Sequence, residues 1–309
     1  MASEISSVAI IGCGNVGSAC AASLLAQPSV RELILIDHSE DKALGEARDL
    51  QHSVPLGTPV KVIAGSYKEA AASQVAVITV GAPGKFTGSR LDMLKENVVL
   101  VRECIAKIMS EGFQGVLLLA SNPVDVLTYI AQQESGLPVG QVIGTGTLID
   151  SERLRAALAE HLKVDARSVH ANVIGEHGDS SVPVWSSAQI GGIPLAIFPG
   201  ANELAPRDEL QRVVRQAGPE VAALKGNTCF AIAACVTRIC QAILRDERSV
   251  LMVSTRIDGQ YGLQDVSFST PCIVGKNGIE TVLELALNAP EQEALIESAT
   301  ILKEAFASL

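Results

Sequence analysis

The sequence predicts an α/β protein, with a Rossmann-type parallel-sheet domain over residues 1–146 and an α+β domain over residues 147–309. Three observations lead to this prediction. The first half alternates short β-rich runs with helical patterns, which is typical of a parallel sheet covered on both faces. After Leu148 this alternation gives way to longer helices and a hairpin. At 309 residues, the chain is long enough for two domains.

The elements of the first half follow from apolar runs and helical periodicity. Strands are expected at residues 8–11, 32–37, 61–64, 75–81, 116–121 and 141–144. Helices are expected at residues 16–25, 42–51, 91–110 and 124–133. The polar, glycine-containing segment 83–89 follows a buried strand, so it is either a simple connection or a lid over a site at the strand's carboxyl end.

The second half is predicted to be mainly helical, with one hairpin. We expect helices at 150–161, 183–190, 206–217, 220–245 and 289–307, a β-rich run at 169–174, and an antiparallel pair at 250–257 and 265–274. The two long helices should be broken or kinked at Gly218-Pro219, because proline lacks the amide donor.

Composition excludes several classes of partner. The formal charge of −10 argues against nucleic acid or an anionic membrane, and an anionic substrate would need its own arginines. Hydrophobic residues make up 48%, so we expect apolar surface to be covered in a homo-oligomer. The start of the sequence does not resemble a signal peptide, and no apolar run has the length of a membrane span. Seven cysteines without a C-x-x-C pair favour reduced thiols in the cytoplasm, and we assign no metal.

A glycine motif predicts a dinucleotide site. In Gly12-x-Gly14-x-x-Gly17, the first glycine permits a tight turn, the second lets the backbone approach a pyrophosphate, and the third allows close helix–strand packing. Asp37 ends the next strand at the expected distance, where a carboxylate binds ribose hydroxyls and repels a 2′-phosphate. NAD is therefore favoured over NADP. The alternative is a glycine turn followed by a helix-capping aspartate.

A histidine between two glycines and two carboxylates predicts proton transfer. His177 lies in Gly175-Glu-His-Gly-Asp179, and Asp150, near the start of a helix, is its most plausible partner. A buried carboxylate would fix the tautomer and raise the pKa of His177. Arg153 lies three residues after Asp150 on the same helix face, and Arg90 ends the segment 83–89. The alternatives are a structural histidine and two surface arginines.

With these residues in order, the chain resembles the L-lactate/malate dehydrogenase family from about Val8 to Ala307, and most closely its bacterial NAD-dependent L-lactate enzymes. The segments that carry the resemblance are Gly12-Cys-Gly-Asn-Val-Gly17, Asp49-Leu-Gln-His52, Ser89-Arg-Leu-Asp92, Ser121-Asn-Pro-Val-Asp125, Gly144-Thr-Gly-Thr-Leu-Ile-Asp-Ser-Glu-Arg153 and Gly175-Glu-His-Gly-Asp179.

The resemblance implies a role for each site residue. His177 would donate a proton to a 2-oxo group as hydride arrives from NADH, with Asp150 orienting its ring. Arg153 would bind the substrate carboxylate, and Arg90 would polarise the carbonyl oxygen. The implied substrate-binding residues are Arg153, Asn122, Thr228 and Gly84. The implied cofactor-binding residues are Gly12, Gly14, Asn15, Val16, Gly17, Asp37, Gly81, Asn122 and Ile232.

The segment 83–89 bears on the choice of substrate. Malate enzymes of the family place an arginine where this chain has Gly84, and lactate enzymes usually place glutamine, so the chain departs from both. Leu91, Glu176, the run 183–185 and Thr228 favour the lactate branch. Without a charge at Gly84, a second substrate carboxylate would lack a partner. We expect a pyruvate/lactate enzyme with broadened tolerance for larger 2-oxo acids; a malate dehydrogenase is the alternative.

The sequence also bears on regulation and on other classes of protein. Family members activated by fructose 1,6-bisphosphate carry an arginine and a histidine at a subunit interface, and this chain has Arg155 and His170 there. The alternative is an exposed arginine and a loop histidine. The related NAD-dependent glycosidases need a metal-binding cysteine, yet none occurs between Cys104 and Cys229. A non-catalytic NADH sensor should have lost a catalytic residue, and none is lost.

Overall fold

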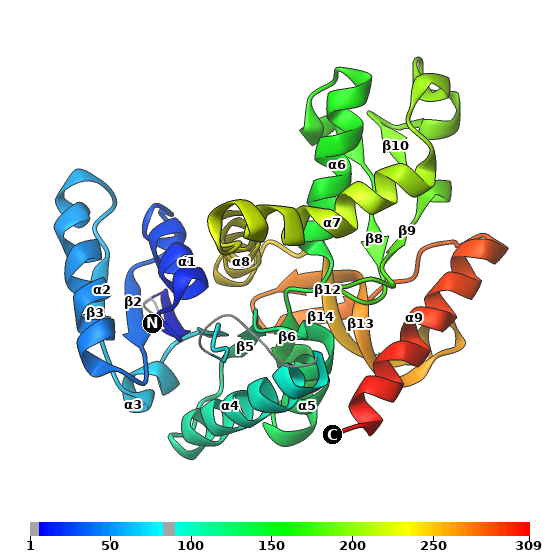
Figure 1. Ribbon diagram of the computed structural model, residues 1–309. Coiled ribbons are helices and arrows are strands. Elements are labelled where there is room, and N and C mark those ends of the chain that lie inside the picture. The colour runs from blue at the N-terminus through cyan, green and yellow to red at the C-terminus, as the bar shows by residue number, and fades with distance from the viewer. Residues whose placement is uncertain (1–5, 83–89) are drawn as a thin grey trace.

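The computed structural model describes residues 6–82 and 90–309, and for residues 90–93 the backbone alone. A nine-stranded sheet in the order β14-β13-β12-β6-β5-β4-β1-β2-β3 runs through the molecule (Figure 1). The six strands of the first half are parallel and have the doubly wound order, which confirms the predicted α/β class. They are β1 Ser7–Ile11, β2 Glu32–Ile36, β3 Lys61–Ala64, β4 Val75–Ile78, β5 Val116–Leu119 and β6 Val142–Gly144.

The connecting helices lie where the helical patterns predict them. They are α1 Asn15–Leu25, α2 Glu40–Ser53, α4 Arg90–Ser110 and α5 Val124–Glu134. The short helix α3, Tyr67–Ala71, was not predicted, although Ser66 and Glu69 form a capping box at its start. Since β1 pairs with both β2 and β4, the connections diverge there, and a crevice is expected at the carboxyl edge between these strands.

Three antiparallel strands extend the same sheet. β12, Ser249–Asp258, joins β6 through Ser254 and Gly144, and β13, Gln264–Gly275, and β14, Gly278–Val282, follow. The pairing of β12 with β13 confirms the predicted hairpin. The sheet thus continues across the expected boundary at residue 146, and that boundary stays a prediction.

The rest of the second half forms a small β-rich unit around α6, Leu148–Leu162. The predicted run 169–174 is two strands in different sheets: β7, Val169–His170, pairs with β10, Gln189–Ile190, whereas β8, Val173–Ile174, pairs with β9, Val182–Pro183. The remaining strand is β11, Ile193–Pro194. The helix predicted at 183–190 is therefore wrong. Tertiary contacts decide this segment, because the Ser186 amide and hydroxyl both bind Glu291.

The two long helices meet later in the chain than predicted. Helix α7, Arg207–Lys225, continues through Pro219. Helix α8, Phe230–Leu244, begins five residues after the end of α7. Proline removes one backbone hydrogen bond, and here the helix continues past it. Gly226, at φ +89°, ends α7 in the left-handed conformation that glycine favours. The last helix, α9, spans Ala289–Ala307 as predicted. The short 3-10 turns are Val54–Leu56, Val139–Gln141, Ala166–Ser168, Trp185–Ser187, Leu195–Ile197, Ala201–Glu203 and Gln260–Gly262.

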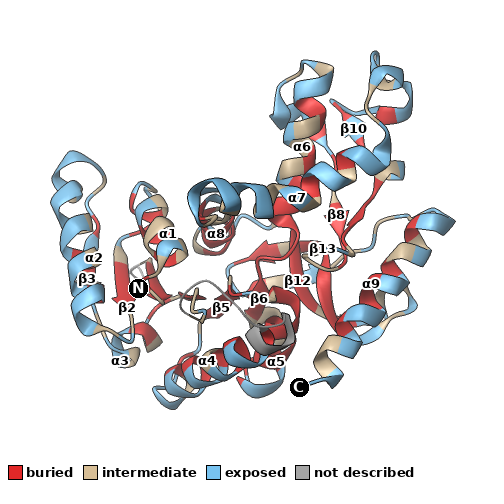
Figure 2. Ribbon diagram, viewed as in Figure 1, coloured by how far each residue is buried: buried red, intermediate tan, exposed pale blue. Residues whose placement is uncertain are grey.

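The inner strands of the large sheet are buried (Figure 2). Alternate residues of these strands face two different apolar layers. Ile11 of β1 packs in the layer formed with α4, α5 and α9, whereas Ile10 packs in the layer formed with α1 and α8. Packing on both faces explains why the inner strands β4 and β5 are apolar throughout. In the described part of the chain, no helix combines the length and apolar character needed to span a membrane.

Candidate active site

The glycine motif forms the turn between β1 and α1, and each glycine meets a different constraint. Gly12 has φ +105°, a conformation that side chains rarely adopt. At Gly17, a Cβ atom would lie 1.8 Å from the Gly12 carbonyl oxygen, so only glycine permits the close packing of helix on strand. At Gly14, a Cβ atom would meet no atom within 4 Å. That open side is where a pyrophosphate would approach the backbone.

The N-terminus of α1 offers donors to an anion. Gly14 is the N-cap residue and has no side chain to cap the first turn, which contains Asn15, Val16 and Gly17. The first amides of a helix have no partner within the helix, and the helix dipole favours negative charge there. These residues therefore fit the phosphates of a dinucleotide.

Asp37 follows β2 and braces the glycine turn. Its Oδ2 accepts a hydrogen bond from the Cys13 amide over 2.8 Å, and its Oδ1 accepts one from the Ser39 amide over 3.1 Å. Ser39, not Asp37, is the N-cap residue of α2, which removes the helix-capping alternative. The carboxylate therefore lies next to the glycine turn, where it would face a ribose. Burial raises the pKa of the neighbouring Cys13 thiol to about 12, so this thiol is not a nucleophile.

Asn97, which the sequence did not single out, joins two predicted site segments. Its Oδ1 accepts a hydrogen bond from the Ala82 amide over 2.8 Å, and its Nδ2 donates to the Asn122 carbonyl oxygen over 2.7 Å. Asn97 is buried on α4, and Gly81 is the residue before Ala82. The ends of β4 and β5 are thus held together at the carboxyl edge of the sheet.

Thr228 lies in the connection between α7 and α8, and Ile232 lies in the first turn of α8. Helix α8 lies beside α1 (Figure 1). Thr237 of α8 donates a hydrogen bond to Ser23 of α1, and Gln241 donates one to Gln27, just after α1. Ile232 packs against the same apolar cluster as Val16. Ile232 therefore belongs to the layer that also carries the glycine turn.

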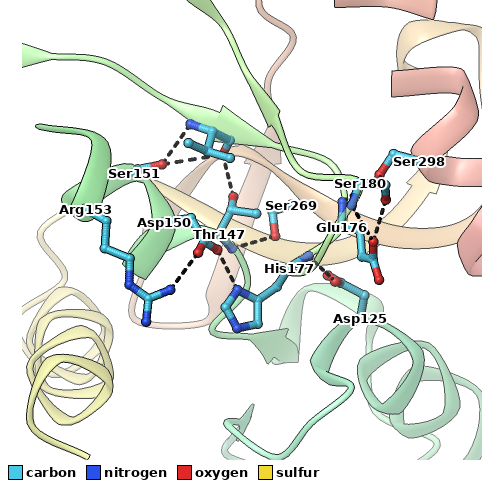
Figure 3. Close-up of polar contacts among 11 residues, drawn as sticks. Asp125, Thr147, Asp150, Ser151, Arg153, Glu176, His177, Ser180, Ser269 and Ser298 are labelled. Carbon is cyan, nitrogen blue, oxygen red and sulfur yellow. Dashed lines mark hydrogen bonds and ion pairs between the residues drawn. The ribbon is translucent and has the colours of Figure 1, made fainter. Parts of the chain in front are cut away.

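His177, Asp150 and Arg153 lie together (Figure 3). Asp150, in the first turn of α6, accepts a hydrogen bond from His177 Nδ1 over 2.5 Å through Oδ2, and one from Arg153 Nη1 over 3.0 Å through Oδ1. The Asp150 side chain is 7% exposed, whereas that of His177 is 23% exposed. Because Nδ1 is bound to Asp150, Nε2 is the ring nitrogen available to a substrate.

The charges in this cluster support one another. Burial lowers the pKa of His177, whereas the charge and hydrogen bond of Asp150 raise it. The two effects of Asp150 outweigh burial, so the pKa of His177 lies above the usual value. Burial raises the pKa of Asp150, whereas His177 and Arg153 lower it. Together the two neighbours outweigh burial, so the pKa of Asp150 lies below its usual value and the carboxyl stays ionised. A protonated imidazole is thus stabilised at a half-buried site, as a proton donor requires.

The loop that carries His177 is held from three sides. Gly175 exchanges two backbone hydrogen bonds with Ser269 of β13. The Glu176 amide donates to Ser298 of α9, and the Glu176 carboxylate accepts from Ser180. The His177 amide donates to Asp125 Oδ2 over 2.7 Å. The contacts with Ser269, Ser298 and Asp125 join segments far apart in the sequence, so no local pattern predicted them.

Two predicted site residues cannot be placed in full. Gly84 lies outside the described residues, and for Arg90 the structure gives only the backbone, which begins α4. Arg155 is placed: its guanidinium contacts Glu152, Asn172 and the Ala171 carbonyl oxygen. His170 is exposed on β7, next to these partners in the chain.

Comparison with known proteins identifies the family. Residues 6–144 match the lactate/malate dehydrogenase NAD-binding domain, and residues 147–308 match the alpha/beta C-terminal domain of the same family. L-lactate dehydrogenase of Priestia megaterium is 46% identical over 301 residues, 96% of this chain and 94% of that protein. That of Lacticaseibacillus casei is 41% identical over 300 residues, 96% of this chain and 92% of that protein.

Solved structures agree. The minor L-lactate dehydrogenase of Enterococcus mundtii in its ligands-bound form superposes with a TM-score of 0.94 at 38% identity, covering 98% of each chain. A lactate dehydrogenase from a deep-sea metagenome superposes with a TM-score of 0.95 at 37% identity, covering 99% of each chain. These similarities support an L-lactate over a malate dehydrogenase. The chain belongs to the lactate/malate dehydrogenase family and is an NAD-dependent oxidoreductase.

Proposed function

We propose that the protein reduces pyruvate with NADH and a proton to L-lactate and NAD, and catalyses the reverse reaction. The contact of 2.5 Å between His177 and Asp150, with Arg153 on the same carboxylate, carries the proposal. Bound NADH supplies the hydride. The L-lactate dehydrogenase names of the relatives at 46% and 41% identity favour this substrate over oxaloacetate.

The residues divide the remaining work. His177 donates its Nε2 proton to the 2-oxo oxygen, and in reverse accepts the proton from the 2-hydroxyl group. Asp150 holds the tautomer and stabilises the imidazolium. Arg153 has further guanidinium donors beyond the one bound to Asp150, and these bind the substrate carboxylate. Arg90 polarises the carbonyl, Asn122 binds near it, and Gly84, Thr228 and Ile232 border the substrate and cofactor.

A substrate panel tests this assignment. NADH oxidation should give the highest specificity constant with pyruvate, measurable rates with 2-oxobutyrate and phenylpyruvate, and the lowest with oxaloacetate. Oxaloacetate as the best substrate would overturn the lactate assignment, and no turnover with any of the four acids would overturn the proposed reaction.

The absence of an arginine at Gly84 accounts for the expected rejection of a second carboxylate. Gly84→Arg should raise the specificity constant for oxaloacetate relative to pyruvate, because the new guanidinium pairs with that carboxylate. Gly45→Arg on α2 is the matched control, since a side chain there meets no atom within 4 Å. An unchanged ratio in Gly84→Arg would show that residue 84 does not read the substrate.

We also propose that fructose 1,6-bisphosphate binds between subunits at Arg155 and His170. The Arg155 guanidinium is bound to Glu152 and lies against residues 171 and 172, beside His170 in the chain. A phosphate would compete with Glu152 for this guanidinium. The sugar bisphosphate should lower the pyruvate KM of the native enzyme but not of Arg155→Gln. Arg167→Gln, which removes an exposed arginine paired with Asp165, is the control. An unchanged KM and oligomer in the native enzyme would end this proposal.

The protein is proposed to act as a homo-oligomer, a tetramer or a dimer, in the cytoplasm. Several apolar side chains are exposed in the single chain, among them Leu56 at 91%, Leu224 at 88% and Phe230 at 74%. A second copy covering them would remove this surface from water. All seven cysteines are buried and unpaired, which suits a reducing compartment. Light scattering should give two or four times the chain mass; the mass of one chain would contradict the oligomer.

A further inference from the structure

The carboxyl group of Asp125 links the parallel-sheet half of the chain to the loop that carries His177. Asp125 lies in the first turn of α5 and is 2% exposed. Its Oδ2 accepts a hydrogen bond from the His177 backbone amide over 2.7 Å (Figure 3). The preceding amide, that of Glu176, donates to Ser298 Oγ of α9 over 2.9 Å. Two helices that lie far apart in the sequence, α5 and α9, thus hold consecutive amides of the loop.

Two carboxylates act on different parts of the same histidine. Asp150 binds the ring at Nδ1, and Asp125 binds the backbone. The ring contact fixes how the imidazole is rotated, whereas the backbone contact fixes where its Cα atom lies. Both are needed to define the direction of Nε2. A small displacement of a reacting group lowers the rate of a reaction steeply.

Asp125 is held in unfavourable surroundings for a carboxylate. Its Oδ1 has no hydrogen-bond partner among the described residues, and neither has the hydroxyl of Ser254. Burial raises the pKa of Asp125 to about 6, although the hydrogen bond from the His177 amide and the charge of His177 lower it. A buried ionisable group with an unpaired oxygen destabilises a fold, so its presence here points to a role in the loop's function.

The space behind Asp125 does not suit a second ligand. A cavity of about 10 Å³ lies between α5, β13 and α9, lined by Asp125, Ser267 and Phe306 among others. This volume is about that of one water molecule. Asp125 therefore serves the His177 loop rather than a separate site for an organic molecule.

We propose that Asp125 is a positioning residue for proton transfer: its oxygen fixes the backbone of His177, and its negative charge stabilises the protonated imidazole. The inference rests on the proposed function, in which His177 exchanges the proton. The charged groups of the described residues that face His177 are Asp150 and Arg153 from α6 and Asp125 from α5. Glu176, beside His177, faces Asp125.

Two substitutions separate the hydrogen bond from the charge. Asp125→Asn keeps an acceptor oxygen but removes the charge, so kcat at low pH should stay near the native value. The pH midpoint of pyruvate reduction should fall, by roughly half a unit or more. Asp125→Ala removes both, so its kcat should fall on the order of tenfold to hundredfold, with the affinity for NADH unchanged. A larger loss of kcat in Asp125→Ala than in Asp125→Asn measures the effect of the hydrogen bond to the His177 amide.

Gln132→Ala is the matched control. Gln132 is also buried on α5, and it binds Thr255 of β12 and Ser267 of β13 without contacting the His177 loop. It should lower the melting temperature but leave kcat and the pH midpoint unchanged. If Asp125→Ala and Asp125→Asn behave like Gln132→Ala, the inference is overturned. The variant His177→Asn distinguishes failure of the inference about Asp125 from failure of the proposed function. If His177→Asn keeps native turnover, the proposed function itself fails.

Discussion

At the scale of single residues, the sequence predicted the centre of the site but not its supports. His177 was found from its glycine-rich surroundings, and Asp150 and Arg153 from their spacing on one helix. Asp125 and Asn97 act through contacts that the chain makes only when folded: Asp125 lies 52 residues from His177, and Asn97 lies 25 residues from Asn122. Asp125 ends a segment that carries the family resemblance, but nothing in the sequence indicated its partner.

The pair of His177 and Asp150 makes a prediction for pH dependence. The pKa of His177 is raised in the folded protein, so the proton donor is present at low pH and is lost as the pH rises through this pKa. Pyruvate reduction should therefore decline with a midpoint above the usual histidine value. Asp150→Asn should move the midpoint to lower pH and lower kcat on the order of 10²-fold, as measured in steady-state pH profiles. A midpoint that does not move in Asp150→Asn would show that this carboxylate does not set the proton affinity.

At the scale of elements, the strands and helices that local patterns control were predicted well. All six parallel strands, and the helices between them except α3, lie where apolar runs and periodicity placed them. The errors fall where tertiary contacts or helix ends decide the structure. The conformation of residues 183–190 depends on the contact between Ser186 and Glu291, which lies far away in the sequence. Helix α7 continues past Pro219 and ends at Gly226. Gly226 after Lys225 was a helix-ending signal that the proline obscured.

The turn into α1 makes a prediction with an internal control. Gly14→Ala adds a Cβ atom in open space, so the melting temperature should stay close to native, while the Kd for NADH should rise about tenfold or more because the pyrophosphate needs that space. Gly17→Ala places a Cβ atom 1.8 Å from the Gly12 carbonyl oxygen and should lower the melting temperature as well. Thermal unfolding and NADH titration check both. Native NADH affinity in Gly14→Ala would place the cofactor elsewhere.

At the scale of the whole molecule, the sequence predicted the α/β class but not the continuous sheet. The pattern changes after Leu148, yet β12 pairs with β6, and the antiparallel strands extend the parallel ones. Strand pairing between residues 110 positions apart leaves no local signature. Because the sheet is continuous, it supports both the cofactor-binding edge and the His177 loop. The loop is attached through hydrogen bonds to Asp125 of α5 and Ser269 of β13.

Asp125 also predicts how global stability depends on pH. Its pKa is raised from 3.8 to about 6, so the folded state binds more protons than the unfolded state between these values. Its contribution to stability is full below about pH 4 and is lost as the pH rises through about 6. The free energy of unfolding of Asp125→Asn, relative to that of the native protein, should therefore increase by on the order of 2–3 kcal/mol from pH 4 to pH 7. Urea unfolding at both pH values measures this difference. A constant difference across this range would mean that Asp125 does not titrate abnormally.

The most direct test of the account is the single-turnover rate of NADH oxidation by saturating pyruvate in His177→Asn. The Asp150–His177–Arg153 cluster predicts a rate lower by a factor on the order of 10² to 10⁴, with the affinity for NADH unchanged, because only the proton donor is removed. Turnover at the native rate in this variant would contradict the assignment of His177 as the proton donor.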